Sequence, residues 1–461
     1  MSADPLAILE NALRDALAAH AAPGSRVAVA LSGGIDSMVL LDVAAALAAS
    51  EEVAVSALHV NHGFSPNARR WAEFCAAQCA ARGVELAVHE LRIERRRGRS
   101  LEAEARTARY ASLLSADVDV VLLAHHADDQ AETVLLQLVR GAGPRGLAAM
   151  PPFKPGRPAL LRPFLEQPRT MLAAYAAACG LSWVDDESNA DRTLARNALR
   201  HEVAPLLAAR FPGYPQTLVR AARLQAQASA LLDELAGIDA SGAIDASGLE
   251  QARLAVLSQA RARNLLRWFL CEQGLRPPSE ARVAEMLRQL LDAGADGRVR
   301  IGLDGLELGR HRGRVVVHAP DPQPFELPWQ GEAELRLPGG VLAFTPARGA
   351  GLGTAKLARG RVVLRSRAGG ERMRLAENRP TRTLKQLLQE ARVPPWMRQS
   401  LPFVWCGDEL AAVAGIGVAL KFQAAPGEPG WTLDWRPSPT EALREGAQID
   451  KPQGPGAKCP P

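Results

Sequence analysis

The segment Ser32-Gly33-Gly34-Ile35-Asp36-Ser37 stands between a short β-branched run at residues 26–31 and an apolar pattern of helical spacing at residues 37–49. Paired glycines let the backbone approach an anion closely, and the first turn of a helix offers free N–H groups and a partial positive charge. Strand, loop and helix together predict a phosphate-binding loop. The loop lacks the Gly-Lys-Ser/Thr ending of the Walker motif, so it belongs to another class.

The aspartate of this segment distinguishes it from an ordinary turn. A glycine turn capped by serine would explain Gly33, Gly34 and Ser37, but it would not explain Asp36. A carboxylate beside a phosphate requires a cation that both groups share, and Mg²⁺ prefers oxygen ligands of this kind. We therefore expect the loop to bind the phosphates of ATP, and we expect Asp36 to bind Mg²⁺.

Strand and helix patterns alternate over the first 200 residues. Strands are expected at 26–31, 53–60, 85–91 and 118–123, and helices at 37–49, 71–82, 101–115 and 128–140. This alternation predicts an α/β fold, a doubly wound parallel sheet with helices on both faces. Such sheets bind ligands beyond the carboxyl ends of their strands, which is where the phosphate loop begins.

The pattern changes near residue 213, and four further parts follow the first domain. We expect an α/β domain at 1–213, a helical domain at 214–320 in which short strands begin at residue 298, and a strand-rich linker at 321–360. A small α+β domain is expected at 361–435, with a hairpin around Gly407-Asp408. The tail at 436–461 is rich in proline and poor in large apolar residues, which predicts disorder.

Basic residues are concentrated in two places although the net charge is only +5. Residues 361–421 hold eleven lysines and arginines against five acids. Two separate basic patches suit a long polyanion better than a small metabolite. A solvated surface or flexible loop is the alternative for the second patch. That patch consists of Arg92, Arg95, Arg96, Arg97 and Arg99.

Composition also bears on the compartment. No stretch approaches the roughly 18 apolar residues of a membrane helix, so no membrane association is expected. Leu6, Leu9, Leu13 and Leu17 repeat at helical spacing and predict an amphipathic helix instead of a signal peptide. The six cysteines form no C-x-x-C pair, which favours the reducing cytoplasm.

A second polar motif follows the fourth expected strand, at residues 124–133. Asp129 and Glu132 are three residues apart, and Asp128 and Glu132 are four apart, so these acids share a face of the first helical turn. Acids at a helix start commonly act as caps. A metal site with the two preceding histidines is the alternative, and capping is favoured because adjacent histidines point to different faces.

The first motif resembles that of the pyrophosphate-loop ATPases, which implies a fold like that of adenine nucleotide alpha hydrolases. That superfamily cleaves ATP between the α and β phosphates and adenylates a carbonyl oxygen of its substrate. The second motif is similar to the signature of tRNA(Ile)-lysidine synthases. Further similar stretches are Arg140-Gly141-Ala142-Gly143, Leu161-Arg162-Pro163-Phe164, Trp183-Val184-Asp185-Asp186-Glu187-Ser188-Asn189, Arg196-Asn197, Arg200, Gly369-Gly370-Glu371-Arg372, Lys385-Gln386-Leu387-Leu388 and Pro394-Pro395-Trp396. The resemblance implies that residues 1–213 are the ATP-pyrophosphatase catalytic domain, that residues 214–320 bind substrate or tRNA, and that residues 361–435 bind tRNA.

The resemblance implies a two-step ligation. ATP adenylates the C2 carbonyl oxygen of the wobble cytidine in the isoleucine tRNA with a CAU anticodon, and the ε-amine of free L-lysine then displaces AMP. The implied cofactors are ATP and Mg²⁺, and the implied partners are this tRNA, lysine and a second copy of the chain in a homodimer. A tRNA thiolase of the same superfamily is the closest rival, but that chemistry usually relies on C-x-x-C cysteines.

The resemblance also implies roles for single residues. Asp36 would bind the Mg²⁺–pyrophosphate, while Asp129 and Glu132 would hold or deprotonate the lysine amine. An amine of pKa near 10.4 loses its proton at pH 7 at a cost of about 4.6 kcal/mol, so such help is useful. Arg106 aligns best with the family's catalytic arginine, and Arg109 on the same helical face is the alternative. A surface salt bridge would explain either arginine without catalysis.

The segment at residues 185–200 carries two interpretations that the sequence leaves open. Its polar residues build either a capped helix start or a contact with lysine or RNA. The residues concerned are Asp185, Asp186, Ser188, Asn189, Arg196 and Asn197.

Overall fold

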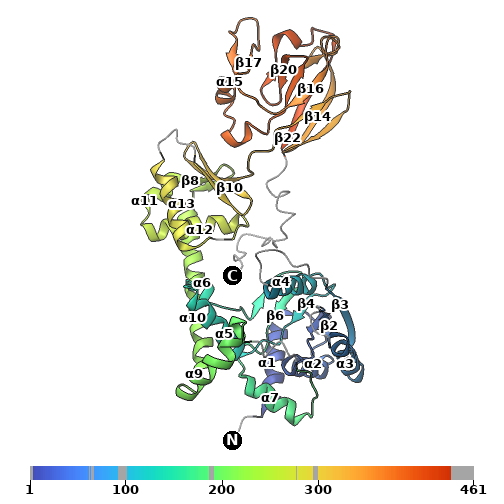
Figure 1. Cartoon of the computed structure of the whole chain (residues 1–461), viewed down its shortest axis with the longest axis vertical. Helices are drawn as coiled ribbons and strands as arrows, with labels where there is room; N and C mark the ends of the chain where they lie inside the picture. The colour runs from blue at the N-terminus through green and yellow to red at the C-terminus, as the bar shows by residue number, and fades with distance from the viewer. Residues whose placement is uncertain are drawn as a thin grey trace. The chain divides into compact units, whose positions relative to one another are not determined.

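The computed structural model describes residues 4–61, 63, 67–91, 101–185, 192–276, 278–293 and 299–437. The arginine run at residues 92–99 and most of the expected disordered tail, residues 438–461, lie outside this part. The chain divides into two compact units, with the boundary between Leu232 and Asp233 (Figure 1).

The first unit is built on a six-stranded sheet of order β3-β2-β1-β4-β6-β5. All neighbouring strands are parallel except β5, which runs antiparallel to β6. The expected parallel sheet is confirmed. Its strands are β1 (Arg26–Ala30), β2 (Ala54–Asn61), β3 (Glu85–Glu90), β4 (Val120–Leu122), β5 (Phe153–Lys154) and β6 (Ala159–Leu161).

Helices cover both faces of this sheet. On one face, α1, α2 and α7 pack on one another, and on the other face Leu113 of α4 joins a cluster with Leu58, Val121 and Leu160. The helical segments are α1 (Pro5–His20), α2 (Ile35–Leu47), α3 (Ala68–Ala81), α4 (Leu101–Leu114), α5 (Ala127–Val139), α6 (Pro144–Leu147), α7 (Arg169–Ala178), α8 (Ala195–Ala198), the π-helical turn η2 (Leu199–Val203), α9 (Ala204–Arg210) and α10 (Tyr214–Ala240).

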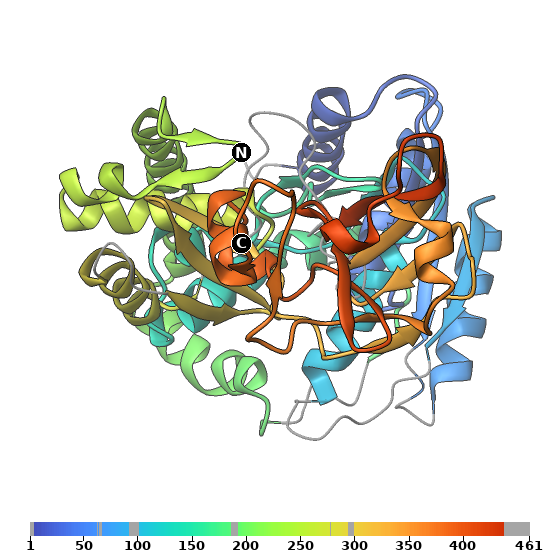
Figure 2. The ribbon, with the colours of Figure 1, turned by 90° about the horizontal axis from the view of Figure 1, so that it is seen from above.

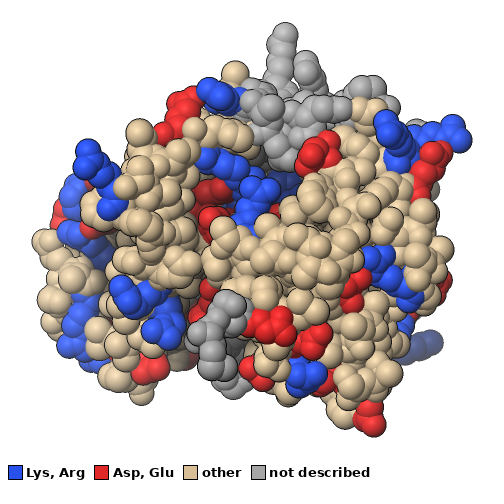
Figure 3. Space-filling model, turned by 90° about the horizontal axis from the view of Figure 1, so that it is seen from below, with Lys and Arg blue, Asp and Glu red and all other residues tan. Residues whose placement is uncertain are grey.

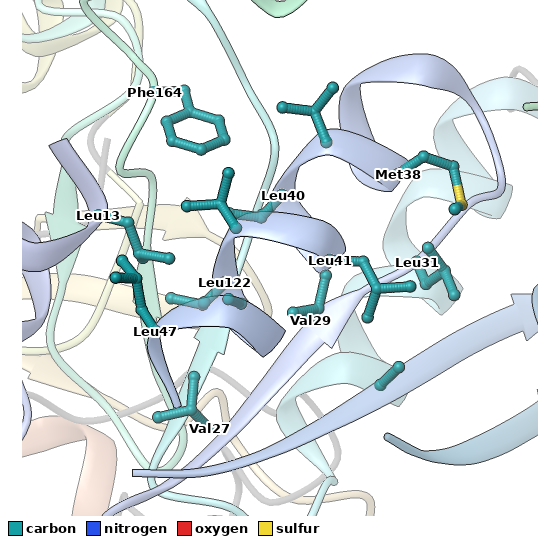
Figure 4. Packing of buried hydrophobic residues seen from close by; sticks show 14 of the residues in the cluster. Leu13, Val27, Val29, Leu31, Met38, Leu40, Leu41, Leu47, Leu122 and Phe164 are labelled. Atoms are coloured by element: carbon teal, nitrogen blue, oxygen red, sulfur yellow. The ribbon is translucent and has the colours of Figure 1, made fainter. Parts of the chain in front are cut away.

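The larger core of the first unit fixes the strand that precedes the phosphate loop. Leu40 and Leu41 of α2 lie over Val29 of β1 and Leu122 of β4, and all four side chains are fully buried (Figure 4). Burying each such side chain contributes roughly 1.5–3 kcal/mol. The expected amphipathic helix also joins this core, since Leu9, Leu13 and Leu17 of α1 are buried in it.

The strand order places the two polar motifs side by side. The chain leaves β1 toward β2 on one side, whereas β4 pairs with β1 on the other. A crevice at such a switch point, beyond the carboxyl ends of the strands, is where open α/β sheets bind ligands. The phosphate loop follows β1 and the His125-His126 segment follows β4, so both lie at this point.

The second unit begins with helices and a five-stranded sheet of order β7-β8-β11-β10-β9. Helices were expected up to residue 291 and short strands from residue 298, so β9 to β11 fall where strands were expected, whereas β7 and β8 were not expected. The sheet and helices α11 to α13 share one core cluster that includes Leu265, Met286 and Val315. The elements are β7 (Ile244–Asp245), β8 (Gly248–Glu250), α11 (Gln251–Val256), α12 (Gln259–Glu272), α13 (Glu280–Asp292), β9 (Arg300–Leu303), β10 (Leu306–His311) and β11 (Arg314–His318).

The remainder forms two further sheets, of order β12-β16-β19-β20-β21 and β13-β14-β22-β15, and the small pair β17-β18 (Figure 2). Strands of the segment expected as a linker, 321–360, pair with strands that follow it, because β12 pairs with β16 and β14 with β22. Arg436 and Pro437, expected in the tail, end β22. The expected hairpin around Gly407-Asp408 is confirmed by β19 and β20.

Short segments complete this part of the second unit. They are β12 (Glu326–Pro328), β13 (Glu334–Leu337), β14 (Gly340–Arg348), β15 (Leu352–Gly353), α14 (Thr354–Leu357), β16 (Val362–Arg365), β17 (Arg372–Met373), β18 (Arg382–Thr383), α15 (Leu384–Glu390), η3 (Pro395–Met397), β19 (Phe403–Cys406), β20 (Glu409–Val413), β21 (Gly417–Val418), η4 (Leu420–Phe422) and β22 (Pro429–Pro437). Among the residues that the structure describes, none of the helices is both long and apolar enough to cross a membrane.

Candidate active site

The phosphate loop is held in shape by its own serine. The Oγ of Ser37 accepts hydrogen bonds from the N–H groups of Ser32 and Gly33, at 3.2 and 3.1 Å, and donates to the Gly34 carbonyl at 2.9 Å. Gly33 has a φ of +88°, a conformation that glycine adopts without strain. Because Ser37 is buried and its hydroxyl hydrogen is already used, its place in the geometry is that of a loop organiser.

Asp36 stands in the first turn of α2 with an unsatisfied oxygen. Its Oδ1 is buried and has no hydrogen-bond partner, while the Nε of Arg169 lies 4.0 Å from it. Its Oδ2 lies 3.6 Å from Nε2 of His126. An orphaned carboxylate oxygen beside a phosphate loop fits a divalent cation that completes its shell with phosphate and water oxygens. No group of three or more His, Cys, Asp or Glu side chains among the described residues could hold a metal alone.

His126 begins helix α5 as its N-cap. Its Nδ1 accepts from the N–H of Asp129 at 3.4 Å, and Oδ2 of Asp129 accepts from the N–H of His126 at 3.2 Å. This reciprocal pair is a capping box, which satisfies two N–H groups of the first turn. Capping, the interpretation favoured from the sequence for these acids, is confirmed for Asp129.

Two arginines form ion pairs with the two acids of α5, Asp129 and Glu132. Arg196 donates from Nε to Glu132 at 2.7 Å and from Nη2 to Asp129 at 2.9 Å. Arg200, one helical turn later, donates from Nε to Glu132 at 2.6 Å and from Nη2 to Asp129 at 3.0 Å. Bidentate pairs of this kind fix geometry as well as charge. We call these four residues the arginine–carboxylate quartet.

Asp129 of the quartet and its neighbour His126 are both shifted toward their charged forms. Burial raises the pKa of Asp129, but His126 and Arg196 outweigh it, and the net pKa falls to about 2. Burial lowers the pKa of His126, but Asp36 and Asp129 raise it by more than burial lowers it. The pKa of His126 therefore lies above its ordinary value. Figure 3 shows basic side chains gathered in a hollow on one face of the molecule, with acidic side chains beside them.

Histidine 125 behaves differently from its neighbour. Burial, with Arg162, Arg196 and Arg109 nearby, lowers the pKa of His125 to about 3, so its ring is neutral. Arg109 therefore lies within the electrostatic reach of the site. Arg106, three residues before Arg109 on α4, has its Cζ 5.2 Å from the centroid of the Tyr110 ring, and both arginines are exposed.

Sequence patterns located some of these residues and not others. Asp129 and Glu132 were found because their helical spacing is local. Arg169, whose N–H donates to Asp128 at 2.9 Å, carries no local signal, because its partner lies 41 residues away. The pairing of Arg196 and Arg200 with α5 spans 64 to 71 residues and is equally invisible. Asp186, Ser188 and Asn189 lie outside the described residues, and Asp185 is exposed.

Three family models match the chain. A PP-loop domain matches residues 7–207, a TilS substrate binding domain matches residues 249–316, and a TilS substrate C-terminal domain matches residues 362–435. The first contains the phosphate loop and the quartet, and the third contains the basic segment.

Curated relatives cover nearly the whole chain. The tRNA(Ile)-lysidine synthase of Nitrosomonas europaea is 44% identical over 431 residues, which is 92% of this chain and 94% of the relative. The enzyme of the same name from an Azoarcus species is 44% identical over 94% of this chain and 96% of its own.

Solved structures show weaker likeness. The U34-tRNA thiolase NcsA of Methanococcus maripaludis is 18% identical with a TM-score of 0.42, over 48% of this chain and 78% of its own. A TilS C-terminal domain is 21% identical with a TM-score of 0.22, over 25% of this chain and 99% of its own. The family assignment is therefore based on the curated relatives and not on these solved structures.

Proposed function

The chain belongs to the tRNA(Ile)-lysidine synthases, and from this premise we propose how its residues join lysine to a tRNA. As a member of that family it is a tRNA-modifying enzyme with an ATP-using PP-loop domain. The proposed reaction adenylates the C2 carbonyl oxygen of the wobble cytidine in the isoleucine tRNA with a CAU anticodon. Free L-lysine then displaces AMP to give lysidine, and pyrophosphate is the other product.

The phosphate loop binds the nucleotide in this proposal. The backbone of Ser32, Gly33, Gly34 and Ile35 faces the phosphates, at a helix start that favours anions. Mg²⁺, when bound, would neutralise charge on the departing pyrophosphate. The orphaned Oδ1 of Asp36 supports its assignment as the protein ligand of that ion.

The lysine amine is received by Asp129 and Glu132. The observation that carries this assignment is that both carboxylates are buried and fixed by Arg196 and Arg200. Asp129 also lies 3.4 Å from Nε2 of His126, which contacts Asp36 of the phosphate loop at 3.6 Å. An ionised carboxylate accepts hydrogen bonds from an amine and orients it. For the arginine that offsets charge on the adenylated intermediate, the alignment implies Arg106, whereas the reach of Arg109 toward His125 and Arg196 supports Arg109.

The basic C-terminal segment holds the tRNA body. Several of its basic side chains are paired with acids, as in Arg382–Glu390 and Lys421–Glu409. Others are exposed around β17 and α15 and suit phosphate contacts, which supply affinity and position without reading sequence. These are Arg372, Arg374, Arg379, Lys385 and Arg392.

Two further parts of the proposal concern the state of the enzyme. We place the reaction in the cytoplasm, where tRNA, ATP and free lysine occur together. The family resemblance implies a homodimer, which light scattering of the purified protein tests. A mass of one chain at micromolar concentration would contradict it.

Exchange of labelled pyrophosphate into ATP tests the first half of the reaction. If the tRNA is adenylated before lysine enters, exchange requires the CAU-anticodon transcript and Mg²⁺ but not lysine. Exchange without RNA, or none with RNA present, would contradict the proposed order.

A further inference from the structure

The arginine–carboxylate quartet poses a problem for the second step. Asp129 and Glu132 together accept five hydrogen bonds from Arg196 and Arg200, at 2.6 to 3.0 Å. Both arginines come from one short segment, α8 and η2, and are four residues apart, so they reach α5 as a pair. The two negative charges that would attract a lysine ammonium are thus already matched by two positive ones.

The carboxylates are also poor proton acceptors. The pKa of Asp129 lies near 2, about eight units below that of a free lysine amine. General-base catalysis is efficient when the pKa of the base lies near the working pH, and this carboxylate is far from that condition. Asp129 can accept a hydrogen bond from the amine, but it does not remove the proton of the ammonium group. The nitrogen needs to lose that proton before its lone pair can attack C2.

Positive groups surround the acids from several elements. Arg109 of α4 and Arg162, which follows β6, act on His125 together with Arg196, and Arg200 lies within electrostatic reach of Asp36. A cation entering this site meets more positive than negative neighbours. The charged or titratable groups facing the quartet are Asp36, Arg109, His125, His126, Asp128, Arg162, Arg169 and Tyr214.

We propose that Arg196 and Arg200 make lysine nucleophilic, by matching the charge of the carboxylates that receive it so that the ε-amine enters the site without its proton. This inference rests on the proposed function, because it takes Asp129 and Glu132 as the amine's acceptors. The proton passes to solvent as lysine binds. The neutral nitrogen then forms the bond to C2, the C2–O bond breaks, its electron pair leaves on AMP, and the proton released by the new C–N bond passes to solvent.

The carboxylates retain room for the amine. Oδ2 of Asp129 accepts from the His126 N–H at 3.2 Å and lies 3.4 Å from Nε2 of His126, whereas Arg196 and Arg200 both donate to Oδ1. Each carboxylate oxygen has two lone pairs. A neutral amine can therefore donate to Asp129 while both arginines stay in place. Arg196 and Arg200 are positioning residues in this account, since they act through the charge of their partners.

The test is the pH dependence of lysine transfer to tRNA that has been adenylated beforehand, in single turnover with the full-length chain. In the plot of transfer rate against pH, the rate should rise with pH as the amine loses its proton, and we call this part the rising limb. Arg196→Gln and Arg200→Gln should each shift the rising limb to higher pH by about one unit and slow transfer at pH 7 about ten-fold. Calorimetry should show lysine bound no more weakly than by the wild type, because the acids then favour the ammonium form. Arg200→Lys, which keeps the charge, should hold the limb near its wild-type position.

The control is Arg210→Gln, which removes the same charge from the end of α9, on an exposed residue. It should leave the limb and the rate unchanged. The pH at which the transfer rate rises does not depend on the fraction of folded enzyme. A variant that is slower but whose rate rises at the wild-type pH therefore overturns the inference and shows a structural role only. If Asp129→Asn leaves lysine affinity unchanged, the proposed assignment of Asp129 as an acceptor of the amine fails, whatever the arginine variants do.

Discussion

Asp129 combines three tasks at the residue scale. It closes the capping box of α5, balances two guanidiniums and faces His126 beside the phosphate loop. A side chain with so many partners is held in one rotamer, which is what the positioning of a reactant requires. The same partners keep it ionised, so its chemistry is that of an acceptor.

Asp129→Asn should reduce lysine transfer by at least about a hundred-fold, because the amide keeps the shape but replaces an ionised acceptor oxygen with an NH2 donor and leaves Arg196 and Arg200 without part of their partner. Formation of adenylated tRNA should persist. Transfer of labelled lysine and release of AMP measure the two steps separately. Glu202→Gln, an exposed acid of η2, is the matched control and should behave as the wild type. Normal lysine transfer by the Asp129→Asn enzyme would remove this residue from the mechanism.

The residues of the site differ in how far sequence could predict them. Ser32 to Ser37 and the Asp129/Glu132 pair are local patterns, so spacing alone identifies them. The orphaned oxygen of Asp36 agrees with the expected cation site, while the internal bonding of Ser37 could not be anticipated, since it depends on the turn. Arg196 and Arg200 were noted as similar to a family, but their partners emerge only when α8 and η2 fold back on α5.

At the scale of elements, the phosphate loop depends on close packing behind Gly33. A Cβ atom there would lie 2.9 Å from Cγ2 of Val184 and 3.2 Å from Sγ of Cys75. The Gly33 carbonyl also accepts from the Val184 N–H at 3.0 Å. The loop is therefore fixed from both its own serine and the segment after α7.

Gly33→Ala should weaken ATP binding by at least about ten-fold, because it adds left-handed strain of about 1 kcal/mol or more and a clash that displaces the loop. Equilibrium binding of ATP measures this. Gly24→Ala is the matched control, since Gly24 has a φ of +81° but an added Cβ would meet nothing within 4 Å. It should share the loss in thermal stability and keep ATP affinity. Equal ATP affinity in both variants would show that packing behind the loop is unimportant.

The regular α/β elements were predictable because each of the first four strands and its helix has its own hydrophobic period. β5, β6 and α7 were not, since the strands are two and three residues long and their neighbourhood is rich in proline. β7 and β8 were also missed, in a region expected to be helical, because they are two and three residues long. β9 to β11 fall in the segment from residue 298 where short strands were expected.

The first compact unit carries the candidate active site, and the second compact unit carries a basic surface. The exposed arginines and lysine around β17 and α15 are not among the proposed catalytic residues described above. Their proposed effect is on tRNA affinity alone, and it should depend on salt, since counterions are released when phosphates are bound.

Replacing Arg372, Arg379 and Lys385 together with glutamine should weaken tRNA binding and lower the slope of log affinity against log salt by about one for each lost phosphate contact. Filter binding over a salt series measures both. Arg336→Gln removes an exposed charge from β13, in another sheet, and should change neither. An unaltered slope in the triple variant would place the tRNA elsewhere.

Lysine transfer followed by nucleoside analysis tests the central claim most directly. Purified protein is incubated with ATP, Mg²⁺, labelled lysine and the CAU-anticodon isoleucine tRNA transcript, and the RNA is digested and its nucleosides weighed by mass spectrometry. The account predicts one labelled nucleoside, heavier than cytidine by lysine less one water, formed at the wobble position only when ATP is present. Unmodified cytidine at that position, or label that appears without ATP, would contradict it.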